Sequence, residues 1–137
     1  MTRRQPAQQI AALPFRKRRG QVEVLLITSR ETKRWVIPKG WPMAGLKDFT
    51  SAKREALEEA GVTGRISKTA MGIFDYEKRL KAGETMNCSV VVFPLRVKQL
   101  LRNWKEKSER SRSWFSVDEA VKRVQEPALR TIIQTLI

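Results

Sequence analysis

The sequence predicts an α+β fold, a mixed central sheet with helices packed on it, and an α/β/α sandwich if both faces are covered. β-rich apolar runs on either side of residues 48–60 predict strands that flank one long helix. A capping signature at 116–119 and a proline at 127 predict two short helices at the end of the chain. The 137 residues are expected to form one domain, with residues 1–8 flexible.

The first elements are expected to be strands. Residues 9–15 and 22–29 predict a hairpin around a basic turn at 16–20. Residues 35–37 predict a short third strand that stops at Pro38, because proline cannot donate to a central ladder. Glycines and prolines then indicate a loop over residues 39–45.

A helix is expected to begin near Asp48 and to end at Gly61, where a left-handed cap is usual. After this helix, residues 69–80 and 85–97 predict a second hairpin, and residues 114–115 predict a short strand. The helix has a face of small or apolar residues at helical spacing, which predicts packing on the sheet: Phe49, Ala52, Ala56 and Ala60.

Two helices are expected to close the chain. Ser116 and Glu119 form a capping box for a helix that runs through Val124. Pro127 suits the first turn of the last helix, because its fixed backbone angle is already helical. The core-facing positions of that helix are Leu129, Ile132, Ile133 and Leu136.

Composition excludes several kinds of chemistry. The chain has no histidine, which excludes histidine general bases and histidine-ligated zinc. Its single cysteine, Cys88, excludes an internal disulfide and fits a reducing compartment. No segment approaches the roughly 20 apolar residues of a membrane span, and no signal-peptide core follows the N-terminal arginines. We therefore expect a cytoplasmic monomer or homodimer without a membrane partner.

The charge balance indicates anionic partners. The chain carries 28 Lys and Arg against 14 Asp and Glu, a net charge of +14. Such a field favours phosphorylated small molecules, nucleic acid or anionic lipid, and does not choose among them. A basic surface without a dedicated partner also fits this charge balance.

Three carboxylates mark the long helix as a candidate metal site. Glu55, Glu58 and Glu59 are three and four residues apart, so they share one helix face. Anions so crowded repel one another, which makes sense if a hard divalent cation binds there. Mg²⁺ suits such a site, because it takes oxygen ligands and keeps several waters.

Residues 40–62 resemble the sequence box of the Nudix (MutT-like) hydrolases. In that box a glycine is followed, at fixed spacing, by an Arg-Glu pair, two more glutamates and a Gly-apolar end. The resemblance implies a loop–helix–loop whose carboxylates bind Mg²⁺ or Mn²⁺ against a pyrophosphate. The matching positions are Gly40, Arg54, Glu55, Ala56, Glu58, Glu59, Gly61 and Val62.

The likeness extends to the diphosphoinositol polyphosphate phosphohydrolase branch of that family. It is carried by residues 24–30, 34–38, 72–74 and 110–115, and covers most of residues 10–136. The branch cleaves inositol pyrophosphates and diadenosine polyphosphates. The resemblance therefore implies a Mg²⁺-dependent hydrolase of phosphoanhydride bonds in a polyphosphorylated small molecule.

The resemblance also implies residue roles. Glu55 and Glu59 are the expected metal ligands, and Glu58 shares the role of ligand or of general base. Gly40 lets the loop approach the metal and phosphate closely. Arg54 is expected to orient the glutamates through charge-assisted hydrogen bonds. The phosphate-binding candidates, each of which also fits a solvated surface charge, are Arg16, Arg30, Lys39, Lys78, Arg79 and Arg110.

One position departs from the box, because Leu46 stands where the family usually has glutamate. A compensating carboxylate is sought at Asp75, Glu77, Glu84 or Glu109, each of which also fits a solvated surface. The departure leaves open a non-catalytic sensor. A nucleoside triphosphate or RNA 5′-end pyrophosphohydrolase and a basic RNA-binding protein also stay open as functions. Nucleic acid is the less favoured partner, because the chain has no RNP-like or zinc motif.

Overall fold

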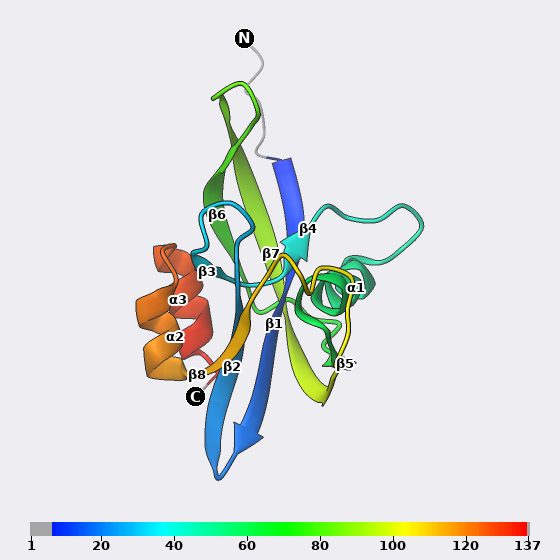
Figure 1. Ribbon diagram of the computed structural model, residues 1–137, viewed down its shortest axis with the longest axis vertical. Coiled ribbons are helices and arrows are strands. Elements are labelled where there is room, and N and C mark those ends of the chain that lie inside the picture. The colour runs from blue at the N-terminus through cyan, green and yellow to red at the C-terminus, as the bar shows by residue number, and fades with distance from the viewer. Residues whose placement is uncertain (1–6, 137) are drawn as a thin grey trace.

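In a computed structural model of the chain, which describes residues 7–136, a mixed sheet lies between one helix and a pair of helices (Figure 1). This confirms the predicted α+β class and the α/β/α arrangement. The elements in chain order are β1 (Ala7–Arg18), β2 (Gln21–Thr28), β3 (Trp35–Val36), β4 (Lys39–Gly40), α1 (Asp48–Ala60), β5 (Val62–Ile66), β6 (Gly72–Arg79), β7 (Thr85–Leu100), β8 (Arg112–Ser116), α2 (Val117–Arg123) and α3 (Pro127–Gln134).

The centre of the sheet is the pair β1 and β7, which run parallel to each other. The main path through the sheet is β3-β2-β1-β7-β5, while β4 pairs with β1, β6 with β7 and β8 with β2. The pairings other than β1–β7 are antiparallel, so the sheet is mixed, as predicted. β1 places its residues alternately on the two faces and therefore contributes to both cores.

Each face of the sheet has its own core. On one face the alanines at positions 52, 56 and 60 of α1 pack against Ile10, Leu25 and Phe93. These small residues let the helix approach the strands closely. On the other face α2 and α3 pack on the sheet, with Leu129 and Ile133 buried against it. The helical stripe predicted for α1 and the stripe at 129–133 are thus confirmed.

The predicted helix boundaries also hold. Gly61 ends α1 in the left-handed conformation with φ 64°, and its N–H donates to the carbonyls of Ala56 and Leu57. Ser116 caps α2 by accepting a hydrogen bond of 3.1 Å from the N–H of Glu119. None of the helices among residues 7–136 is both long enough and apolar enough to span a membrane.

Several expected boundaries were wrong. The segment 62–66 was not expected to be a strand, yet it forms β5 on the edge of the sheet. Lys39 and Gly40 were expected in a loop, but they pair with β1 as β4. Of the residues expected to be flexible, 1–6 lie outside the described part, whereas Ala7 and Gln8 are paired with β7.

Candidate active site

Two glutamates of α1 meet the short strand β4 beside the centre of the sheet. Because the alanine face of α1 packs on the sheet, the acidic face is turned toward β4 and the loop at 101–111. The Glu55 carboxyl lies directly against Gly40. A Cβ placed on Gly40 would come within 2.5 Å of the Glu55 carboxyl carbon. A side chain at position 40 would therefore displace the Glu55 carboxyl from this place.

Glu59 is the buried member of the pair, with an exposed fraction of 7%. Its Oε1 accepts a 3.3 Å hydrogen bond from the N–H of Lys39, and its carboxyl is hydrogen-bonded to that of Glu55. Burial, together with that hydrogen bond, raises the pKa of Glu59 to about 8. Burial also raises the pKa of Glu55. In the absence of a cation the two carboxyls are therefore suited to share a proton.

Lys39 adds a cation beside this pair. Its Nζ lies 4.8 Å from the centroid of the Tyr76 ring. Burial lowers the pKa of Lys39 to about 8, although the charge of Glu59 opposes this shift. The positive charges of Arg34 and Lys78 lower this pKa further. The charge of Lys78 thus acts on Lys39, and the binding of phosphate by these two residues stays a prediction.

The carboxylate pair fits part of a divalent-cation site. Among residues 7–136 no three carboxylate or thiol side chains converge closely enough to form a complete ligand set by themselves. Mg²⁺ commonly binds through one or two carboxylates and completes its shell with waters and substrate phosphates. Glu55 and Glu59 supply that smaller set, and burial raises the pKa of both carboxyls.

Glu58 and Arg54 lie away from this pair. Glu58 turns toward the 101–111 loop, where its Oε1 lies 3.4 Å from Lys105 Nζ. Arg54 is exposed and, among the described residues, has no ion pair or side-chain hydrogen bond with any of the three glutamates. The orienting contact expected of Arg54 is therefore not present in this structure.

Arg110 makes the contact with a site glutamate that was expected of Arg54. Its guanidinium is buried and lies 3.7 Å from Glu59 and 2.8 Å from Glu106. It also donates a 3.1 Å hydrogen bond to the carbonyl of Thr28. Since its donors are occupied by protein groups, Arg110 holds the site together in this structure rather than presenting a free guanidinium to phosphate.

Glu106 is a site residue that sequence reasoning missed. Its charge contributes, after burial, to the raised pKa of Glu55 and of Glu59. Its N–H donates to the carbonyl of Glu58 at 3.0 Å, which attaches the loop to α1. The signal available in the sequence is the isolated Trp104 two residues earlier, because a tryptophan in a polar segment commonly anchors a loop.

Trp104 and Arg112 fasten this loop to the end of α1. Trp104 donates a 3.1 Å hydrogen bond to the Glu59 carbonyl, and the Arg112 guanidinium stacks over its ring at 3.9 Å. Arg112 also donates to the carbonyls of Ala60, Gly61 and Leu101 at 2.7–3.1 Å. The bond to the Ala60 carbonyl satisfies a group that the helix end leaves without a partner, and the bond to Leu101 joins the loop to this end.

The remaining basic candidates are scattered. Arg16 is paired with Glu23 at 2.7 Å and stacks over Trp114, so it is already occupied by protein groups. Arg30 is exposed on the loop after β2 and lies 3.8 Å from Glu109. Arg79 is exposed at the end of β6.

None of the four carboxylates expected to compensate for Leu46 takes the place of the missing glutamate. Leu46 is exposed in a turn, where its N–H donates to the Met43 carbonyl. Glu109 pairs with Arg30 instead of reaching the Glu55–Glu59 pair. The remaining three candidates lie on the surface, exposed to solvent: Asp75, Glu77 and Glu84.

Fold and site together define a class of protein: an α/β/α sandwich that presents a carboxylate-bearing helix behind a glycine-containing strand. A family model described as the NUDIX domain matches residues 6–136. The chain therefore belongs to the NUDIX domain family, the family that residues 40–62 predict. The predicted enzyme class, a Nudix hydrolase, is thereby confirmed, and that family generally uses divalent metal cations.

Curated relatives support the same assignment. The chain is 32% identical to "Nudix hydrolase 21, chloroplastic" of Arabidopsis thaliana, over 95% of the chain and 66% of the relative. It is also 32% identical to "Diphosphoinositol polyphosphate phosphohydrolase 3-alpha" of Mus musculus, over 84% of the chain and 67% of the relative. The chain thus spans about two thirds of the length of these relatives.

Solved structures agree on the fold. The C. elegans Ap4A hydrolase superposes with a TM-score of 0.67 at 21% identity, covering 96% of both chains. The NUDIX domain of Shewanella oneidensis NrtR, complexed with ADP ribose, gives a TM-score of 0.70 at 15% identity, over 97% of this chain and 88% of that one. At these identities the likeness establishes a shared fold.

Proposed function

We propose that the protein hydrolyses phosphoanhydride bonds in a highly anionic, polyphosphorylated small molecule, with Mg²⁺ as its cofactor. A diphosphoinositol polyphosphate or a diadenosine polyphosphate is the favoured substrate class. Relatives named for each of these activities support the choice. The net charge of +14 supports a substrate with many negative charges.

The observation that carries the proposal is the Glu55–Glu59 pair against Gly40. Two hydrogen-bonded carboxyls with raised pKa values are costly to a fold unless a cation compensates them. A bound Mg²⁺ would neutralise phosphate oxygens and acidify a water. Glu55 and Glu59 would hold it, while Gly40 leaves room for the backbone and the Glu55 carboxyl to approach each other.

The other residues of the site either orient the glutamates or bind the phosphates of the substrate. Arg110 orients Glu59 and Glu106 through its buried guanidinium. Lys39 and Lys78 supply positive charge on the side of β4 and β6, where a phosphate chain would meet them. Arg30 and Arg79, both exposed, remain candidates for the outer phosphates of a long substrate.

We assign to Glu106 the role of the carboxylate that Leu46 does not provide. The charge of Glu106 acts on both glutamates of the pair, whereas Leu46 lies in an exposed turn. On this basis Glu106→Gln should reduce turnover by at least about tenfold, in the range found when residues supporting a metal site are removed. Leu46→Glu should change turnover by less than about threefold, and a large gain would show that position 46 limits the rate.

The proposal is tested by measuring phosphate release from a panel of polyphosphorylated compounds with Mg²⁺, with Mn²⁺ and with chelator. The panel contains a diphosphoinositol polyphosphate, diadenosine polyphosphates, nucleoside triphosphates and a 5′-triphosphorylated RNA. We expect metal-dependent turnover to be greatest for the first two. Binding without hydrolysis across the whole panel would overturn the proposal in favour of a sensor.

A further inference from the structure

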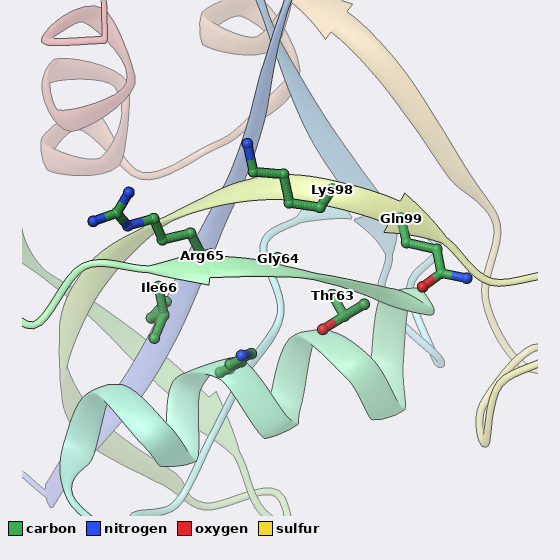
Figure 2. A pocket seen from close by; sticks show the side chains of 7 residues that line it. Thr63, Gly64, Arg65, Ile66, Lys98 and Gln99 are labelled. Carbon is green, nitrogen blue, oxygen red and sulfur yellow. The ribbon is translucent and has the colours of Figure 1, made fainter.

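Two adjoining hollows lie along the edge strand β5, outside the candidate active site. Their volumes are about 540 Å³ and about 400 Å³, and they share Arg65 and Ile66. Figure 2 shows the larger one, where Arg65 and Lys98 point away from α1 while Ile66 and Thr63 point toward it. None of the lining residues belongs to the candidate active site.

The side chains that line these hollows carry positive charges and no negative charge. Several of them are cationic and none is a carboxylate. Within residues 7–136 none of these cations forms an ion pair, in contrast to Arg16, Arg30 and Arg34, each of which has an acidic partner. The cations are Lys53, Arg65, Lys68, Arg96 and Lys98.

Two of the arginines lie directly opposite each other on neighbouring strands of the sheet. Arg65 of β5 is the cross-strand partner of Arg96 of β7. Lys98 of β7 points to the same side as Arg65, away from α1 (Figure 2). Like charges in directly opposite positions destabilise a sheet. Exposed charges also protect an edge strand from pairing with another chain, and an anion that contacts both arginines would relieve the repulsion between them.

The hollow is shaped by an irregularity where β5 pairs with β7, because Lys98 of β7 is an extra residue without a partner in β5. The register shifts between Thr63 and Gly64, which is a β-bulge. A Cβ on Gly64 would collide with the carbonyl oxygen of Arg96, so only glycine allows this approach of the two strands. Bulges commonly turn side chains toward a functional surface at a sheet edge.

We propose that this basic groove, defined by Arg65, Lys68, Arg96 and Lys98 and without Lys53 of α1, binds a strand of single-stranded nucleic acid. Phe15 and Pro94 line the smaller hollow beside Arg65, Lys68 and Arg96 and give it apolar surface. A positive groove with apolar or aromatic contacts is the arrangement that binds single strands without sequence preference. A flat bilayer fits it less well, since the large exposed apolar residues, such as Ile73 and Leu100, do not line the hollows.

The test uses a fluorescently labelled, single-stranded RNA with a 5′-hydroxyl end, so that it presents no phosphoanhydride to the active site. Anisotropy gives its affinity for the wild type and for Arg65→Gln/Arg96→Gln over a series of salt concentrations. The variant should lose at least about tenfold in affinity. Its slope of log K against log salt should be less steep by about 1.4, or about 0.7 for each lost phosphate contact.

The matched control is Lys81→Gln/Arg102→Gln, which removes the same charge from exposed positions outside the groove. It should lose less than about threefold in affinity, the effect of net charge alone. Equal losses in the control and the groove variant would overturn the proposal. So would retained RNA binding by the groove variant, or wild-type binding to phosphatidylserine vesicles without binding to RNA.

Two further measurements distinguish loss of RNA binding from loss of folding and from loss of hydrolysis. The groove variant should melt at the wild-type temperature or above, because it removes a repulsive pair. Lys68→Gln/Lys98→Gln provides a second variant with the same expected loss of RNA affinity.

Glu59→Gln should bind the RNA as the wild type does, so failure of the proposed hydrolase would leave this result unchanged. RNA binding that disappears with Glu59→Gln would place the RNA in the active site and contradict the groove.

Discussion

Glu59 is the residue on which the chemistry of the site depends most. It is buried, it accepts a hydrogen bond from the backbone of Lys39, and its carboxyl contacts that of Glu55. Burial and the hydrogen bond with Glu55 keep a proton on the carboxyl at pH values where an exposed glutamate is ionised. A divalent cation would displace that proton, and its binding should therefore tighten as the pH rises toward 8.

The same shift predicts how stability changes with pH. The pKa of Glu59 rises from 4.5 in the unfolded chain to about 8 in the fold. Between these values the unfolded state loses a proton that the folded state keeps, so the metal-free protein loses stability as pH rises. The stabilising contribution is fully present below 4.5 and is lost above 8. Lys39 titrates between about 8 and 10.5, outside this window.

Denaturant unfolding at several pH values, with chelator present, measures this effect. The wild-type free energy of unfolding should fall by a few kcal/mol across the window. Glu59→Gln should show a much flatter profile, since glutamine does not titrate. Parallel profiles for the two proteins would contradict the assigned pKa.

Gly40 is a second residue whose substitution should lower turnover. In Gly40→Ala the new methyl would lie within 2.5 Å of the Glu55 carboxyl carbon and would displace that group. Because displacements of about 1 Å can cost about 100-fold in rate, turnover should fall by tenfold or more. Gly83→Ala is the control, since Gly83 has φ 82° and open space around it. The control should lose stability and keep its turnover, whereas equal turnover in both variants would refute the role of Gly40.

At the scale of elements, the 101–111 loop and the end of α1 act as one unit. Arg112 bonds to three carbonyls there, and Trp104 bonds to the carbonyl of Glu59. Gly61 has no room for a side chain, because a Cβ would meet Trp104 at 2.6 Å. This packing determines where Glu106 and Arg110 meet the carboxylate pair.

Removing the Arg112 contacts should therefore affect both stability and turnover. Arg112→Gln loses charged hydrogen bonds to the helix end, and the free energy of unfolding should drop by about 2–4 kcal/mol. At a temperature where the variant is folded, kcat should still fall, because Glu106 and Arg110 lose their support. Arg102→Gln, an exposed change in the same loop, should leave both quantities near wild type. A variant that is destabilised but has unchanged kcat would show that the loop does not position the site.

The elements differ in how far the sequence could predict them. Helix α1 was predictable because its alanine spacing, Gly61 and its glutamates all indicate one helix. Strand β5 was not, because Gly64 reads as a loop residue unless its close contact with Arg96 is known. Glu106 and Arg110 reach the Glu55–Glu59 pair through tertiary contacts, which no local spacing encodes.

At the scale of the whole molecule, the positive charge should act on substrate capture. With a net charge of +14, the protein should attract anionic substrates over a distance that salt shortens. The value of kcat/KM for a polyphosphorylated substrate should therefore fall as ionic strength rises, mainly through KM. Steady-state kinetics at low and high potassium chloride concentrations check this, and kcat/KM independent of salt would contradict electrostatic capture.

The fold as a whole brings β4 and the 101–111 loop to the acidic face of α1 (Figure 1). That arrangement supports hydrolysis at the Glu55–Glu59 pair. The most direct measurement compares Mg²⁺-dependent phosphate release by the wild type, Glu59→Gln and the exposed control Glu77→Gln. We expect Glu59→Gln to lose more than about 100-fold while remaining folded by circular dichroism, and Glu77→Gln to match the wild type. Unchanged turnover in folded Glu59→Gln would contradict the account.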